Sequence, residues 1–224
     1  LPGSGRHGVG AKSPLTNAFG DSQAGGFWGA ELKKAGFDAL IIRGASEHPV
    51  YLVVKDGNAS LKDARELWGL PGEQCINKIY QELGTEKVRV AYIGPGGENL
   101  VKYACVGHDL RAFAGRCGLG AVMGSKRLKA IAVMGSGSVP VADVEGIRNL
   151  TRWLAKNRLP GTKSLTKYGT ARILPMLSDQ GGCPTYNFRE GSFEHIDGLT
   201  GEAMNSTLLK TTGRCFACPI ACKR

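Results

Sequence analysis

Three closely spaced cysteines, Cys215, Cys218 and Cys222, are the residues of this chain best suited to bind a metal. Two residues separate the first pair and three separate the second, in the run CFACPIAC. Gaps this short let the sulfur atoms converge on one centre, and cysteine thiolates are the ligands of cubic iron–sulfur clusters. The run therefore predicts three ligands of one [4Fe-4S] cluster.

The fourth ligand of such a cluster has to come from outside the run. We expect Cys75 and Cys105 to be small buried hydrophobic residues, as single cysteines usually are. Cys117 is either reactive or packed against a cofactor, and Cys183 is a weak candidate ligand. The chain begins with Leu rather than Met, so we expect a fragment whose fourth thiolate lies in sequence not present here. A structural zinc site is the alternative, although zinc sites usually show a second pair of ligands.

Two glycine-rich loops could bring backbone N–H groups close to a phosphate. The first, GDSQAGGFWG at 20–29, precedes a short helical segment; the second, AGRCGLGAVMGSK at 114–126, carries Arg116. A guanidinium group suits phosphate oxygens, and Arg6 lies upstream of the first loop. Together they fit one extended, phosphate-bearing cofactor, with tight turns in a crowded sheet as the alternative. The glycine spacing and the basic residues that follow do not fit a dinucleotide-binding fingerprint.

Composition excludes several classes of protein. The chain has 224 residues, 42% of them hydrophobic, 33 glycines and a formal charge of +10. It lacks the run of about eighteen apolar residues that crosses a membrane and a block of about five basic residues that would bind nucleic acid. Seven cysteines, an odd number, argue against a secreted disulfide scaffold and favour the cytoplasm.

The elements that must position these loops follow from local patterns. Branched residues predict strands and Asp56-Gly57 predicts a hairpin turn, while apolar spacing predicts a helix that ends at Gly84 and a second one capped by Asp143. We expect an α+β domain over 1–138 and a helical domain over 139–224, joined by the Gly-Ser-rich stretch at 135–142. The expected strands are 38–43, 50–55, 88–93 and 130–134, and the later helices are 144 to about 158–160, 164–177 and 201–211.

Several motifs together resemble the tungsten-dependent aldehyde ferredoxin oxidoreductase family. They occur in the family's order and cover nearly the whole chain. The motifs are KSPLT at 12–16, AGGFWG at 24–29 with Leu32, Lys33 and AGFD at 35–38, YIGPGGEN at 92–99, GLGAVMGSK at 118–126 with LKAI at 128–131, and the terminal cysteine run.

This resemblance implies an α+β fold, in which an amino-terminal two-sheet pterin-binding domain is followed by the truncated start of an all-helical domain. It implies a tungsten (or molybdenum) bis-pterin centre beside a [4Fe-4S] cluster, and oxidation of a small aldehyde to a carboxylic acid. Electrons would pass to ferredoxin or another acidic carrier; neither nucleic acid nor a membrane is expected, and a homo-oligomer is left open. The alternative is a non-catalytic zinc- or cluster-bearing binding module with a basic surface.

The resemblance also assigns residues. The cluster ligands would be Cys215, Cys218 and Cys222, and the substrate-shaping residues would lie in later domains, so the chain alone should be inactive. Position 23 holds Gln where the family is expected to have Asn, which keeps the amide at a longer reach. None of the histidines His7, His48, His108 and His195 has zinc-like spacing, and each is expected at the surface or in a loop. The residues expected to contact the pterin are Arg6, Gln23, Gly25, Gly26, Arg116, Cys117 and Gly118.

Overall fold

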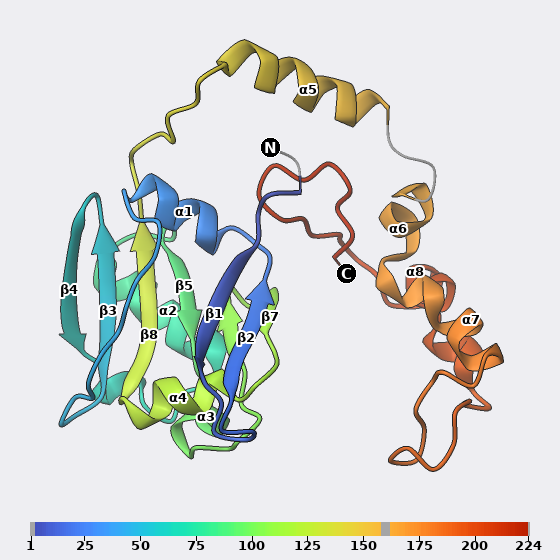
Figure 1. Cartoon of the computed structure of the whole chain (residues 1–224), viewed down its shortest axis with the longest axis horizontal. Coiled ribbons are helices and arrows are strands. Elements are labelled where there is room, and N and C mark those ends of the chain that lie inside the picture. Colours follow the sequence, from blue (N-terminus) through green and yellow to red (C-terminus); the bar gives the residue numbers. More distant parts are fainter. Residues whose placement is uncertain (1–2, 158–161, 224) are drawn as a thin grey trace. The chain divides into compact units, whose positions relative to one another are not determined.

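A computed structural model describes residues 3–157 and 162–223 of the chain (Figure 1). The chain divides into two compact units, one of residues Gly3–Ala142 and one that begins at Asp143. The first unit contains every strand of the two sheets together with four α-helices, and the second contains the other helices. This mixed architecture, a two-sheet unit followed by a helical one, confirms the expected α+β fold class.

A six-stranded mixed sheet forms the centre of the first unit, in the order β4-β3-β8-β5-β6-β7. Strands β3 and β8 are parallel, and the other neighbours are antiparallel. A separate antiparallel pair, β1 and β2, places His7 opposite Ala24. The strands are β1 His7–Lys12, β2 Phe19–Ala24, β3 Val50–Lys55, β4 Asn58–Asp63, β5 Arg89–Tyr92, β6 Val106–His108, β7 Ala112–Ala114 and β8 Leu128–Met134.

Helices cover both faces of the large sheet. Side chains of α1 and α4 pack in one apolar cluster with Ile131 and Val133 of β8, and side chains of α2 pack in another with Ala130 and Ala132. This alternation is expected of a central strand buried on both faces. The helices of this unit are α1 Trp28–Lys34, α2 Gly72–Leu83, α3 Pro95–Glu98 and α4 Leu119–Ser125, with the 3₁₀ turn η1 Arg65–Leu67.

The locally determined elements lie where the sequence predicts them. Asp56 and Gly57 both have positive φ, at 44° and 83°, as a tight reversed hairpin turn requires, and they join the antiparallel strands β3 and β4. Gly84 ends α2 in the left-handed conformation. Asp143 caps its helix by accepting a hydrogen bond from the Gly146 N–H at 2.8 Å.

The strand predicted over 38–43 was wrong. This segment is not paired with any strand of the described chain, and the Ile41 side chain is 81% exposed. Branched residues favour an extended backbone, but a strand also needs a neighbour to complete its hydrogen bonds. The composition of the segment carries no information about that neighbour.

The second unit consists of short helices and turns. One helix was expected over 164–177, but the structure interrupts it at Gly169, whose φ of 66° and ψ of −160° are not helical. The expected end of the first helix at 158–160 lies outside the described residues. The elements are α5 Val144–Lys156, α6 Thr162–Tyr168, η2 Thr170–Ile173, α7 Leu174–Asp179, η3 Ile196–Leu199 and α8 Gly201–Thr207.

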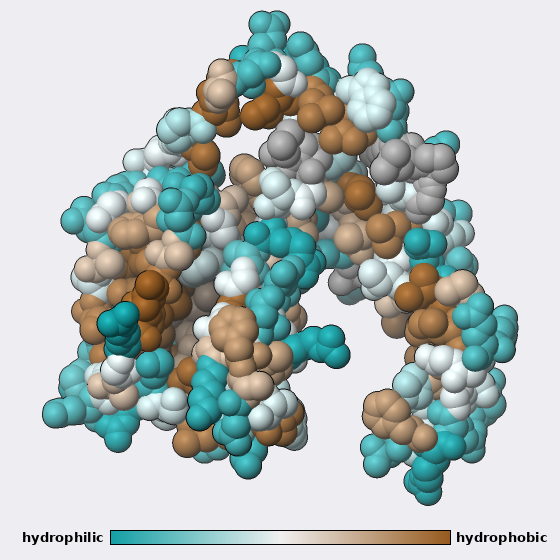
Figure 2. Space-filling view, in the orientation of Figure 1, coloured by the Kyte–Doolittle hydropathy of each residue, from teal (hydrophilic) through white to brown (hydrophobic). Residues whose placement is uncertain are grey.

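Helix α5 buries none of its side chains. Figure 2 shows hydrophobic residues along one side of this helix and hydrophilic residues along the other. Leu150 and Trp153 of this helix are 46% and 52% exposed. Within the described residues, no helix has the length and apolar character needed to cross a membrane.

Candidate functional site

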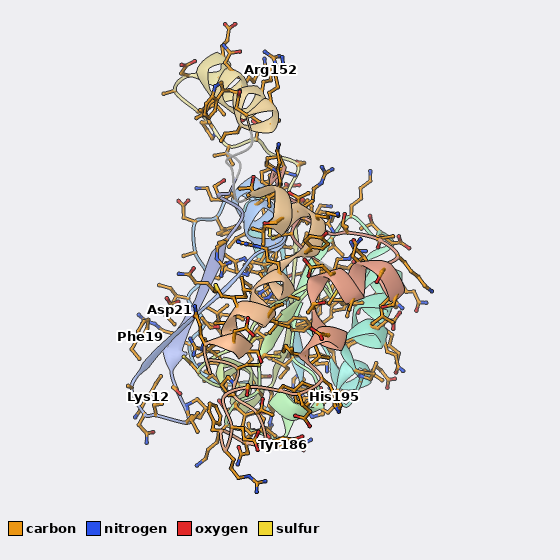
Figure 3. All side chains as sticks on the ribbon, turned by 90° about the vertical axis from the view of Figure 1, so that its right-hand side faces the viewer. Lys12, Phe19, Asp21, Arg152, Tyr186 and His195 are labelled. Atoms are coloured by element: carbon orange, nitrogen blue, oxygen red, sulfur yellow. The ribbon has the colours of Figure 1, made fainter. Side chains whose placement is uncertain are left out.

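The first half of the candidate site is the β1–β2 hairpin, whose exposed face includes two glycines of β1. Gly8 and Gly10 of β1 lie opposite Gln23 and Asp21 of β2, and all four are exposed. Figure 3 shows Asp21 on this hairpin together with Lys12 and Phe19. Because glycine has no side chain, a flat ligand can approach the backbone closely at Gly8, whereas the Phe19 ring lies against Gly10.

Arg6 and Gln23 are held together at one end of this face. Arg6 Nε donates to Gln23 Oε1 and Arg6 Nη2 donates to the Gln23 backbone carbonyl, each over 3.3 Å. Both side chains are exposed. The amide at position 23 therefore orients the guanidinium group, which retains donors for an acceptor from outside the chain.

The second glycine-rich loop, residues 114–126, packs against strand β2. The Arg116 N–H donates to Ser22 Oγ at 3.1 Å, across 94 positions of sequence. The Cys117 thiol donates to the Asp21 carbonyl at 3.6 Å. The structure thus brings together the two loops that the sequence singled out separately.

Cys117 and Gly118 have an unusual backbone conformation. Both have positive φ, at 67° and 69°, and Gly118 is buried immediately before α4. A Cβ at position 118 would clash with the Lys102 carbonyl oxygen. Positive φ in a residue other than glycine costs roughly 1–2 kcal/mol, so the surrounding packing must hold Cys117 in place.

Gly25 and Gly26 connect this hairpin to α1. Gly25 is buried and Gly26 has a φ of 105°, which other residues rarely adopt. The chain then enters α1, where Trp28 Nε1 donates to the Ile131 carbonyl at 3.1 Å. The seven residues expected to contact a pterin, from Arg6 to Gly118, are consequently all placed on or beside the β1–β2 hairpin.

The charge of this region suits an anionic ligand. Arg6 and Arg116 are both exposed, and neither forms an ion pair with any residue that the structure describes. Arginines without acidic partners beside an open backbone can bind phosphate through several donors. A phosphate-bearing cofactor therefore fits the residues that are present.

Two histidines beside this site contradict the expectation of surface positions. The rings of His7 and His108 lie 4.4 Å apart, and the His7 ring lies 5.0 Å from that of Trp28. Burial, followed by the charge of Arg6, lowers the pKa of His7 to about 4. His108 is 2% exposed. Period-two alternation along β1 places His7 on the buried face, and this was the signal that could have revealed it.

The cysteine run forms a loop closed by a short antiparallel bridge. The N–H groups of Gly213 and Lys223 each donate to the other residue's carbonyl, at 2.9 and 3.1 Å. Cys215, Cys218 and Cys222 are partly buried and have free thiols. Ala217 and Ala221, directly before the second and third cysteines, both have a φ of 52°.

The described part of the chain contains no group of three or more His, Cys, Asp or Glu residues gathered to hold a metal. The three thiols are thus near one another in the chain but do not form a ready-made site. Metal binding is commonly coupled to the folding of the segment that carries the ligands, so such a site assembles with its metal. The loop supplies soft ligands of the type that iron–sulfur clusters require.

The other cysteines are distributed through the fold. Cys75 is buried, as expected, and burial raises the pKa of its thiol to about 11. Cys105 is exposed, so its expected burial was wrong. Cys183 is partly buried, and its N–H donates to the Gly191 carbonyl at 2.7 Å.

Known proteins share both parts of this chain. The family model "Aldehyde ferredoxin oxidoreductase, N-terminal domain" matches residues 1–135, and "Aldehyde ferredoxin oxidoreductase, domains 2 & 3" matches 145–224. The tungsten-containing aldehyde ferredoxin oxidoreductases of Thermococcus kodakarensis and Pyrococcus furiosus are 44% and 43% identical over the whole chain. The chain spans 37% of the length of each.

A solved structure has a similar fold over nearly the whole of this chain. The active-site complex BamBC of benzoyl coenzyme A reductase, in complex with 1,5-dienoyl-CoA, superposes with a TM-score of 0.78 at 30% identity. The superposition covers 99% of this chain and 36% of that one. With both family models matched in order along its length, the chain belongs to the aldehyde ferredoxin oxidoreductase family.

Proposed function

We propose that the complete protein oxidises a small aldehyde to a carboxylic acid at a tungsten (or molybdenum) bis-pterin centre. The reaction consumes water and releases two protons and two electrons, which leave one at a time through a [4Fe-4S] cluster to ferredoxin. One observation carries this proposal. The two glycine-rich loops are joined by the hydrogen bond from the Arg116 N–H to Ser22 Oγ, which links residues 94 positions apart in the sequence. Arg6 and Arg116, which form no ion pair within the described residues, lie beside this contact.

The residues of the first unit would bind and orient the cofactor. Arg6, held by Gln23, and Arg116 would donate to its phosphate or ring oxygens, while Gly25, Gly26, Cys117 and Gly118 allow the backbone to approach it. When bound, the metal and its dithiolene ligands supply the redox and oxygen-transfer chemistry. The protein contributes position and electrostatic stabilisation, and residues 1–138 would form its pterin-binding domain.

The second unit would supply three cluster ligands. Cys215, Cys218 and Cys222 have suitable spacing and remain accessible in a closed loop, and the fourth thiolate would come from elsewhere in the complete protein. Residues 139–224 would then be the beginning of a helical domain. We assign no catalytic residue within this chain, and we propose the cytoplasm, where free thiols persist.

Metal and pterin analysis of the complete protein, purified without oxygen, tests this proposal. Tungsten or molybdenum with about four irons per chain supports it, whereas zinc alone identifies a zinc-bearing binding module instead.

Substitution of Arg116 tests the site itself. Arg116→Lys keeps the charge but loses the planar fork of donors, so we expect about tenfold weaker retention of pterin. Arg43→Lys, at an exposed position of the same unit, is the matched control. Full pterin occupancy in both Arg116→Lys and Arg116→Ala would show that the loop is only structural.

A further inference from the structure

The segment around the cysteine loop is basic and contains no acidic residue. Between Ala203 and Lys223 the sequence has Lys210, Arg214 and Lys223 and neither Asp nor Glu. The chain as a whole has 19 acidic residues against 29 basic ones. The imbalance at the loop is therefore sharper than the general excess of positive charge.

These basic residues lie at or near the Gly213–Lys223 bridge that closes the cysteine loop. The paired hydrogen bonds between Gly213 and Lys223 bring Lys223 beside the residue that precedes Arg214. Lys210 lies three positions before that bridge. Lys210 and Arg214 are exposed, and within the described residues neither forms an ion pair.

The loop between Arg214 and Lys223 also contains apolar residues. Phe216, Pro219 and Ile220 are each partly exposed among the three cysteines. An apolar centre with a polar, charged rim is the usual composition of a protein–protein interface. Complexes between redox proteins are at the small end of interface sizes, where long-range charge attraction sets the rate of encounter.

We propose that Lys210, Arg214 and Lys223 form the docking surface for an acidic electron-carrier protein. The proposal rests on the proposed function in one respect, because the enclosed loop has to carry the cluster that delivers the electrons. Charge complementarity selects the partner: a carrier with a negative surface is attracted to this rim, and its cofactor then approaches the cysteine loop. A binding site beside the electron donor also shortens the path that each electron has to cross.

Charge reversal in the complete protein tests this surface. We expect Lys210→Glu and Arg214→Glu each to lower kcat/KM for an acidic ferredoxin by about tenfold at low ionic strength, with a smaller difference at high salt. Iron content and aldehyde-dependent reduction of a small dye, which needs no docked protein, should change less than twofold. Lys163→Glu, at an exposed position on α6, is the matched control. Equal effects at the control position, or no effect at the loop, would overturn the proposal.

A binding measurement separates this proposal from the proposed function. The affinity of the same ferredoxin is measured by calorimetry, without turnover, for the parent protein and for the doubly reversed Lys210→Glu/Arg214→Glu variant. Salt-sensitive binding that weakens about tenfold in the variant supports the docking surface even if aldehyde oxidation is absent. Aldehyde oxidation combined with equal ferredoxin affinity in both proteins would refute the docking surface and leave the proposed function standing. If the doubly reversed variant has a reduced iron content, Lys210→Gln/Arg214→Gln is measured in its place. Weaker, salt-sensitive binding again supports the docking surface, and unchanged affinity again refutes it.

Discussion

Gly20 on β2 lies directly against Cys117 in the second glycine loop. A Cβ atom at position 20 would fall 2.6 Å from the Cys117 Cβ, closer than real side chains approach one another. Because Gly20 is paired within the β1–β2 hairpin, it cannot move without disturbing that hairpin. The small size of one residue therefore determines how closely the two loops approach.

Gly20→Ala should separate the loops. We expect a loss of about 1–3 kcal/mol in the free energy of unfolding, as for other overpacked sites, together with reduced pterin content. Gly96→Ala, in α3 of the same unit, is the control, because a Cβ at that exposed position would meet no atom within 4 Å. Urea unfolding and pterin analysis of the complete protein check both effects, and equal behaviour of the two variants would contradict the close-contact argument.

Lys129 and Glu98 form a buried ion pair that ties β8 to α3. The side chains are 0% and 4% exposed, Lys129 Nζ also donates to the Leu70 carbonyl at 2.9 Å, and Glu98 Oε2 accepts from the Gly69 N–H at 2.7 Å. Lys129→Met leaves Glu98 buried without its cation, which should destabilise the fold by about 3–5 kcal/mol.

The matched control for this pair is Lys62→Met. Lys62 pairs with Glu82 at 2.8 Å, but both side chains are well exposed, so its loss should cost less than about 1 kcal/mol. Equilibrium unfolding of the two variants under the same conditions gives the comparison. Similar losses in both would mean that burial does not set the contribution of the Lys129 pair.

Local chemistry and tertiary contacts explain what the sequence could and could not reveal. The turn at Asp56-Gly57 and the helix end at Gly84 were predictable because the residue type itself favours a positive φ, above all in glycine, which has no Cβ. The absence of a strand over 38–43 and the burial of His7 depend on neighbours distant in sequence. The approach of Arg116 to Ser22 also depends on a distant neighbour. The composition of the two glycine-rich loops and their arginines suggested a shared ligand, but the sequence did not show that the loops touch.

His7 should make the fold sensitive to acid. Its pKa is lowered from 6.5 to about 4 in the folded state, first by burial and then by Arg6. The unfolded chain therefore binds more protons between these pH values, so the stability that His7 contributes is present above about 6.5 and is lost as the pH falls toward 4. With its partial exposure taken into account, the effect should be roughly 1–3 kcal/mol.

His7→Leu removes the titrating imidazole and places an apolar side chain of similar size beside Trp28. The difference in unfolding free energy between His7→Leu and the parent should grow as the pH falls from 7 to 4.5, in favour of the variant. His48→Leu, at an exposed loop position, controls for histidine loss in general. A difference that does not vary with pH would show that His7 titrates normally in the folded protein.

Cys218 is the central thiol of the cysteine loop, and its backbone N–H donates to the Cys215 carbonyl at 3.1 Å. If this loop holds three ligands of a [4Fe-4S] cluster, Cys218→Ala should remove the electron paramagnetic resonance signal of the reduced cluster. Iron should fall from about four per chain toward zero, since cubes rarely persist without one protein thiolate. Ferredoxin reduction should be lost with the iron. Cys105→Ala, at an exposed thiol in the other unit, should retain signal, iron and activity. An unchanged signal in Cys218→Ala would remove this loop from the proposed path of the electrons.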